Sequence, residues 1–171
     1  MNREDKLRIA DTINDSIVDG PGIRLTIFVQ GCPHNCEGCH NPGTHDFDGG
    51  RDVTMGEMLD KAAANPLLDG VTFSGGEPFC QAAKLAWLGE QFKKTGLNIV
   101  TYSGYTFEQL LAGAASENGW RELLEVTDLL VDGPFVKHLR DLTLKFRGSS
   151  NQRIIDVKKS LECGEAVQAD Q

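Results

Sequence analysis

The chain has no apolar run that approaches the roughly 20 residues needed to cross a bilayer. Its first ten residues, MNREDKLRIA, are charged and lack the apolar stretch of a signal peptide. Lysine and arginine are nowhere concentrated, and the formal net charge is −8. These absences argue against nucleic-acid and membrane partners and predict a cytoplasmic protein.

Several catalytic signatures are also missing. The sequence contains no phosphate-binding loop, no dinucleotide fingerprint and no recognisable Ser-His-Asp arrangement. The length of 171 residues predicts one domain over 1–171. Its core should span about 11–157, and residues 158–171 should form a C-terminal helix and tail that is partly flexible and frayed at its end.

Strand and helix patterns alternate along the chain. Runs of β-branched and apolar residues predict strands, whereas capping boxes and apolar stripes of helical period predict helices. The predicted strands are 23–30, 70–73, 97–102, 127–131 and 153–157, and the predicted helices are 54–64, 80–94 and one that starts at 106. Such alternation indicates an α/β fold with a mostly parallel sheet.

The number of strand–helix units is too small for a closed barrel. A complete eight-unit β/α barrel takes about 250 residues, so we expect an incomplete, TIM-like β/α barrel. Ligands bind at the carboxyl ends of the strands in such folds. Cys32, residues 74–76, Ser103 and Asp132 each follow a predicted strand, and we expect them to meet at one mouth.

The cysteine usage is the most informative feature that is present. Three of the five cysteines, Cys32, Cys36 and Cys39, lie within eight residues. In a reducing compartment such crowding points to metal rather than to disulfides. One loop with three thiolates suits three corners of a [4Fe–4S] cube and leaves the fourth iron free to bind another ligand.

Two other metal sites remain open at this point. Zinc would need a fourth ligand from His40 or His45, although zinc sites usually have two separated cysteine pairs. A closed cluster would need Cys80 or Cys163 as its fourth ligand. Either alternative would make the chain a non-enzymatic binding or electron-carrier module.

The cysteine motif, CxxxCxxC, resembles that of the radical S-adenosylmethionine superfamily. The segment SGGEP at 74–78 is similar to the superfamily's GGE motif and follows the second predicted strand. The segment DGPGIR at 19–24, with QGC at 30–32 and CHNP at 39–42, is similar to glycyl-radical activating enzymes.

Two later segments narrow the resemblance. DGPF at 132–135 and RGSSNQ at 147–152 are similar to the anaerobic ribonucleoside-triphosphate reductase activating proteins. Most superfamily members have an aromatic residue just before the third cysteine, whereas this chain has Gly38 there. A glycine at that place is compatible with the reductase-activating branch.

The resemblance implies a mechanism and a set of cofactors. The open iron would bind S-adenosylmethionine, and reductive cleavage would yield methionine and a 5′-deoxyadenosyl radical. That radical would take a hydrogen atom from a glycine of the partner, an anaerobic ribonucleoside-triphosphate reductase. A low-potential donor such as flavodoxin or ferredoxin would supply the electron.

The resemblance also implies the cofactor contacts. Cys32, Cys36 and Cys39 would ligate the cluster. The predicted S-adenosylmethionine contacts lie in two loops: Gly75, Gly76 and Glu77 toward the methionine part, and Gly38 and His40 toward the adenine.

Other roles remain open. Activation of pyruvate formate-lyase is one alternative, and small-molecule chemistry such as that of 7-carboxy-7-deazaguanine synthase is another. Arg147 and Arg153 suit either a contact with the reductase or a place on the surface, and Asp132 suits either a ligand contact or a turn.

Overall fold

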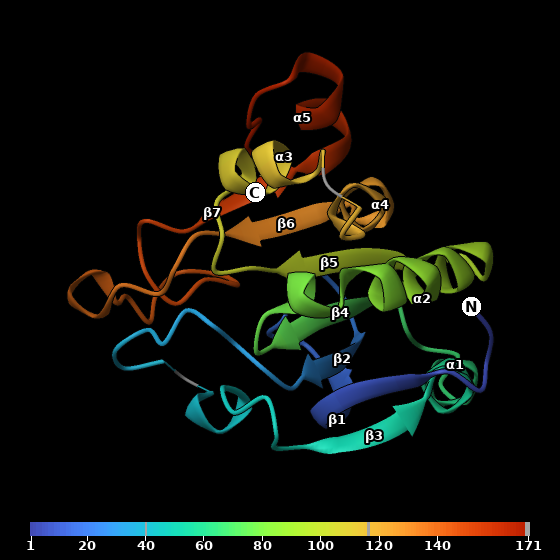
Figure 1. The fold of residues 1–171 in the computed structure, drawn as a ribbon. Coiled ribbons are helices and arrows are strands. Elements are labelled where there is room, and N and C mark those ends of the chain that lie inside the picture. The colour runs from blue at the N-terminus through green and yellow to red at the C-terminus, as the bar shows by residue number, and fades with distance from the viewer. Residues whose placement is uncertain (40, 116, 170–171) are drawn as a thin grey trace.

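The computed structural model of the chain describes residues 1–39, 41–115 and 117–169. Within them, one sheet has the strand order β3-β1-β2-β4-β5-β6-β7 (Figure 1). The strands are β1 (Lys6–Ser16), β2 (Arg24–Val29), β3 (Arg51–Thr54), β4 (Gly70–Gly75), β5 (Asn98–Tyr102), β6 (Leu129–Asp132) and β7 (Arg153–Asp156).

The middle of the sheet is parallel, and its two sides are antiparallel. β2 pairs in parallel with β4, β4 with β5, and β5 with β6. β1 runs antiparallel to both β2 and β3, and β7 runs antiparallel to β6. β3 and β7 end the strand order on opposite sides, so the sheet formed by the described residues is open. The predicted α/β fold with an incomplete barrel is confirmed.

The helices begin where the sequence places their caps. Thr54 accepts a hydrogen bond from the Glu57 amide at the start of α1, and Thr106 and Gln109 form both bonds of the predicted capping box at α3. The helices are α1 (Met55–Ala63), α2 (Ala82–Lys94), α3 (Phe107–Gly113), α4 (Trp120–Val126) and α5 (Val157–Cys163), with 3-10 turns η1 (Pro42–Thr44), η2 (Pro78–Gln81) and η3 (Lys137–Leu139). No helix of the described residues is long and apolar enough to cross a membrane.

The two faces of the sheet have different environments. On β2, Leu25, Ile27 and Val29 belong to the main apolar core, together with the buried stripe of α2. Phe28, which points to the other face, lines a cavity instead. Figure 1 shows α2 lying across β4 and β5 on the core side. Alternation along the strands therefore builds a packed core on one face and a ligand site on the other.

Several parts of the fold differ from expectation. Strands β1 and β3 and helix α4 were not predicted, and the two strands extend the sheet beyond β2. The chain end was expected to be frayed, but the Asp156 amide donates to the Val167 carbonyl and the Ala169 amide donates to the Ile154 carbonyl. Residues 167–169 thus lie against β7, while residues 170–171 fall outside the described part of the chain.

Candidate active site

A cavity of about 770 Å³ opens where the parallel strands end. Its wall includes Cys32 after β2, Ser74 and Gly75 at the end of β4, Ser103 after β5, and Gly133 after β6. Parallel strands bring their carboxyl ends to the same edge of a sheet, which explains why residues so distant in sequence meet here. The predicted common mouth is therefore present.

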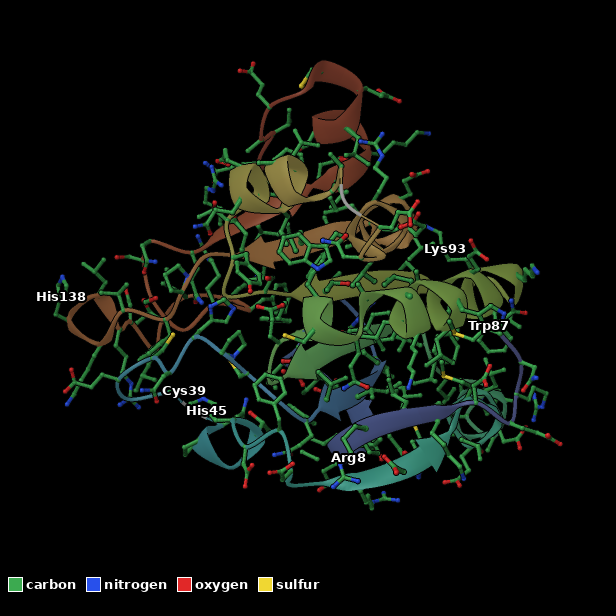
Figure 2. The ribbon with its side chains drawn as sticks, viewed as in Figure 1. Arg8, Cys39, His45, Trp87, Lys93 and His138 are labelled. Atoms are coloured by element: carbon green, nitrogen blue, oxygen red, sulfur yellow. The ribbon has the colours of Figure 1, made fainter. Side chains whose placement is uncertain are left out.

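The cysteine loop forms one side of this cavity. Cys32, Cys36 and Cys39 all line it, all are half-buried, and all are free thiols. Burial raises the pKa of Cys32, with a smaller contribution from the negative charge of Glu77. Iron that bound this sulfur would therefore have to displace its proton. Cys39 and His45, both labelled in Figure 2, line this cavity on the loop side of the molecule.

Backbone hydrogen bonds fix the path of the cysteine loop. The Gly31 amide donates to the Thr44 carbonyl at 2.6 Å, and the Cys32 amide donates to the His45 carbonyl at 3.1 Å. The buried Gln30 side chain donates to the carbonyls of Gly43 and Asp46. The loop is thus closed at its base before any metal binds.

The arrangement suits a cluster better than a single ion. No three His, Cys, Asp or Glu side chains of the described residues stand close enough to hold one metal ion. A cube presents three separate irons to three sulfurs, so its ligands need not converge on one point. Cys80 and Cys163 are exposed and do not line the cavity. The three-cysteine set therefore fits a [4Fe–4S] cluster with one iron left for another ligand.

The paired glycines at the end of β4 are required by close backbone packing. Gly75 has φ +97°, and a Cβ there would lie 2.6 Å from the Val29 amide nitrogen of β2. A Cβ on Gly76 would lie 2.3 Å from the Gly31 carbonyl oxygen. Both glycines line the cavity with backbone alone. Their predicted contact with S-adenosylmethionine stays a prediction, and the structure gives them a packing role as well.

Glu77 is held inside the protein. Its side chain is 0% exposed, and one of its oxygens accepts hydrogen bonds from the Gly104 amide and from the His34 ring, the latter at 2.6 Å. The Ser103 hydroxyl and the Phe79 amide also donate to the carboxylate. These donors occupy the acceptor sites that a bound ammonium would need. The structure thus assigns Glu77 to joining the loops after β2, β4 and β5, and its direct contact with the cofactor stays a prediction.

The structure describes one of the two residues that we predict to contact the adenine. Gly38 has φ +73°, and a Cβ there would approach the side chains of Lys137 and Phe135. Gly38 itself is not part of the cavity wall, so any contact with ligand would come through a change in the loop. His40 lies outside the described residues.

Asp132 lies at the end of β6, but its carboxylate does not face the cavity. It is 1% exposed, pairs with Arg153, and accepts a hydrogen bond from the Phe107 amide at 2.7 Å. Arg153 also pairs with Glu108. Of the strand-end residues, Asp132 is therefore the one that the cavity does not include, and Arg153 serves the fold.

Sequence reasoning missed a polar group in the wall of the cavity. Asp19 lines the cavity and accepts hydrogen bonds from the hydroxyls of Ser16 and Thr26. Arg24 nearby is fully buried, and burial lowers its pKa to about 10. Both belong to the DGPGIR segment at 19–24, whose likeness to activating enzymes was the available signal.

Comparison with known proteins places the chain in a family. The family model described as a 4Fe-4S single cluster domain matches residues 18–155. The anaerobic ribonucleoside-triphosphate reductase-activating protein of Vibrio cholerae is 38% identical over 148 residues, which cover 81% of this chain and 90% of that protein. The chain belongs to the family of anaerobic ribonucleoside-triphosphate reductase-activating proteins.

An activating enzyme for another protein and one solved structure also match. The pyruvate formate-lyase-activating enzyme of Clostridium pasteurianum is 34% identical over 91% of this chain and 63% of that protein. QueE from Escherichia coli, a solved structure, has a TM-score of 0.46 and 18% identity over 59% of this chain and 53% of that chain, a likeness too weak to bear on function.

Membership of the activating-protein family supports an iron–sulfur cofactor, because the matching family model is a 4Fe-4S single cluster domain. Cys32, Cys36 and Cys39, which line the cavity, stay the predicted ligands of that cluster. The comparisons give no support to the zinc alternative, and neither Cys80 nor Cys163 lines the cavity. The resemblance to the radical S-adenosylmethionine superfamily is confirmed.

Proposed function

We propose that the chain activates an anaerobic ribonucleoside-triphosphate reductase by forming a glycyl radical on it. The observation that carries this proposal is the cavity that three cysteines of one loop share with the carboxyl ends of β2, β4, β5 and β6. When bound, the cluster and S-adenosylmethionine supply the electron transfer and the radical that acts on the reductase. The protein supplies position and electrostatics.

The chain's own residues divide these tasks. Cys32, Cys36 and Cys39 hold the cluster. Gly75 and Gly76 present backbone to the methionine part of S-adenosylmethionine, because no side chain intervenes. Glu77 keeps the surrounding loops in register, and Gly38 and His40 belong to the loop that we predict to lie against the adenine.

The rim of the cavity suits a protein substrate. Val18 and Leu142 line the cavity and are 68% and 79% exposed, and Ile17, the residue before Val18, is 71% exposed. An exposed apolar rim of this kind marks a surface that another protein covers. We propose that the reductase docks on this rim and places its glycine in the open mouth.

The remaining partners follow from the same chemistry. A low-potential donor such as flavodoxin or ferredoxin is the proposed electron source. The net charge of −8 supports a function without nucleic acid or an anionic membrane surface. Free thiols suit a reducing compartment, so the cytoplasm is the proposed location.

The test is an electron-spin-resonance assay under anaerobic conditions. The reconstituted, reduced chain is mixed with S-adenosylmethionine and the reductase, and a glycyl-radical signal on the reductase is expected. Cys36→Ala should abolish the signal, whereas Cys163→Ala, a change at an exposed cysteine remote from the cavity, should retain it. A signal on pyruvate formate-lyase in place of the reductase would favour the lyase-activating alternative.

A further inference from the structure

In the RGSSNQ segment at 147–152, two amide side chains anchor the segment through hydrogen bonds, and one arginine side chain stands outside that network. The Gln152 side chain accepts hydrogen bonds from the amides of Gly148 and Ser149 and donates to the Gly133 carbonyl. Asn151 donates to the Pro134 carbonyl. These bonds fasten the segment to the DGP turn that follows β6.

Arg147 is the exception within that segment. Its Nε is buried and has no hydrogen-bond partner, and no other buried side-chain nitrogen or oxygen of the described residues is in this position. Its one hydrogen bond runs from a terminal nitrogen to the Gln152 carbonyl, at the long distance of 3.5 Å. A buried donor without an acceptor is costly, more so when it is charged. The preceding residue, Phe146, has φ +63°, a strained conformation for an aromatic residue that sets the path of the backbone into Arg147.

The surroundings of Arg147 explain what acceptor is missing. Arg147 lines the same cavity as the three cysteines. The acidic residue among the described lining residues is Asp19, whose carboxylate already accepts hydrogen bonds from Ser16 and Thr26. Lys145 adds a second positive charge to the wall near Arg147. Asp141 does not line the cavity, and its carboxylate accepts hydrogen bonds from Thr143. Those bonds lower the pKa of Asp141, and the charge of Arg147 makes a smaller contribution, but Asp141 forms no ion pair with Arg147. Among the described residues that line the cavity, no unbonded carboxylate is available to these cationic donors.

We propose that Arg147 binds the carboxylate of the methionine part of S-adenosylmethionine. The planar guanidinium can direct Nε and a terminal nitrogen to the two oxygens of one carboxylate, which gives Nε its acceptor. The hydrogen bonds of Gln152 and Asn151 hold the segment that places Arg147 in the cavity wall. The proposal rests on the proposed function, because it takes S-adenosylmethionine as the occupant.

Binding of an inert analogue tests the proposal without turnover. S-adenosylhomocysteine has the same carboxylate and adenosine, whereas 5′-deoxyadenosine has no carboxylate. Both are titrated calorimetrically into the cluster-loaded chain under anaerobic conditions. Arg147→Gln should weaken S-adenosylhomocysteine binding roughly tenfold to hundredfold, the range for a lost charge-assisted hydrogen bond, and leave 5′-deoxyadenosine binding unchanged. Arg140→Gln, the same change at an exposed arginine of this loop that does not line the cavity, should alter neither.

The possible outcomes separate this inference from the proposed function. If the unaltered chain fails to bind S-adenosylhomocysteine, the proposed function itself is contradicted. If the unaltered chain binds it and Arg147→Gln binds it equally well, the assignment of Arg147 is overturned. Equal loss of both ligands in Arg147→Gln, with normal iron content, would assign Arg147 to loop folding. If Arg147→Gln weakens only the binding of the reductase, the carboxylate partner of Arg147 lies on the reductase. This outcome and an equal loss of both ligands each contradict the proposal.

Discussion

A single buried side chain, that of Glu77, joins the loops around the cavity through its hydrogen bonds. A fully buried carboxylate is stable only when hydrogen bonds or opposite charges compensate its lost hydration. Here it accepts from three loops at once, through His34, Phe79 and Ser103 among others. The geometry of the cysteine loop therefore depends on a residue that does not line the cavity.

Glu77→Gln tests this positioning role. The amide NH₂ would face donors such as the Gly104 amide, so the free energy of unfolding should fall by about 1–3 kcal/mol in urea denaturation. Glu90→Gln, on the exposed side of α2, should change it by less than about 0.5 kcal/mol. Unchanged stability in Glu77→Gln would contradict the role assigned to its hydrogen bonds.

Cys80 offers a second test at the scale of one residue. Although Cys80 is partly exposed, desolvation of the rest of its side chain, with the negative charges of Glu77 and Cys32, raises its pKa to about 11 from an ordinary value of 9.0. At pH 8 the reactive thiolate is then about a hundredfold rarer than in an unperturbed cysteine. In the cluster-loaded chain, alkylation of Cys80 by iodoacetamide should keep rising beyond pH 10, as followed by peptide mass spectrometry.

The same shift fixes the direction of a stability change. Between pH 9 and 11 the folded chain keeps the Cys80 proton that the unfolded chain loses, so this group makes stability fall as the pH rises through that window. An alkylation rate that levels off below pH 9.5 would show that the pKa is not raised.

At the scale of elements, the close approach of β4 to β2 explains the glycine pair better than ligand binding alone does. Gly75 combines a positive φ with backbone contact, whereas Gly96 has φ +89° and open space around its missing Cβ. Comparing the two positions therefore separates the free-energy cost of a left-handed backbone from the cost of a steric clash with β2.

Gly75→Ala and Gly96→Ala form a matched pair. Gly96→Ala should lower the free energy of unfolding by about 1–2 kcal/mol, the cost of a left-handed conformation. Gly75→Ala should lower it by about 4 kcal/mol or more, because β2 must also move, and it should reduce the iron content after reconstitution. Thermal unfolding and iron assays measure both effects, and equal losses in the two variants would argue against the proposed collision.

The elements also show where sequence patterns were sufficient. Parallel strands buried on both faces are long apolar runs, and helices with capping boxes have clear starts, so β2, β4, β5, α1 and α3 were predictable. β1 was not, because only Leu7 and Ile9 of its apolar residues are buried and the rest of it reads DTINDS, a composition typical of turns. β3 has only four residues and depends on pairing with β1.

The site divides in the same way. The place of Cys32, Cys36 and Cys39 in the cavity wall was predictable because their spacing is local. The burial of Glu77 and the unpartnered Nε of Arg147 were not, since both depend on loops that the fold brings together. Local spacing predicts the ligands of the cluster, whereas tertiary packing decides which polar groups lie around the cavity.

At the scale of the whole molecule, the open sheet decides what can enter the site. The antiparallel strands β1 and β3 on one side and β7 on the other leave a lateral mouth instead of a closed barrel. A cavity of about 770 Å³ with an exposed apolar rim can hold a cofactor while a segment of a second protein reaches it. The shape of the sheet thus agrees with a protein substrate.

The most direct test of the central claim is the electron-spin-resonance spectrum of the reduced cluster in the Cys80→Ala/Cys163→Ala variant, recorded with and without S-adenosylmethionine. The account predicts a four-iron cluster in normal yield, because only Cys32, Cys36 and Cys39 hold it, and a spectrum that changes when S-adenosylmethionine binds the free iron. A variant that loses its cluster, or whose spectrum is identical with and without S-adenosylmethionine, would contradict it.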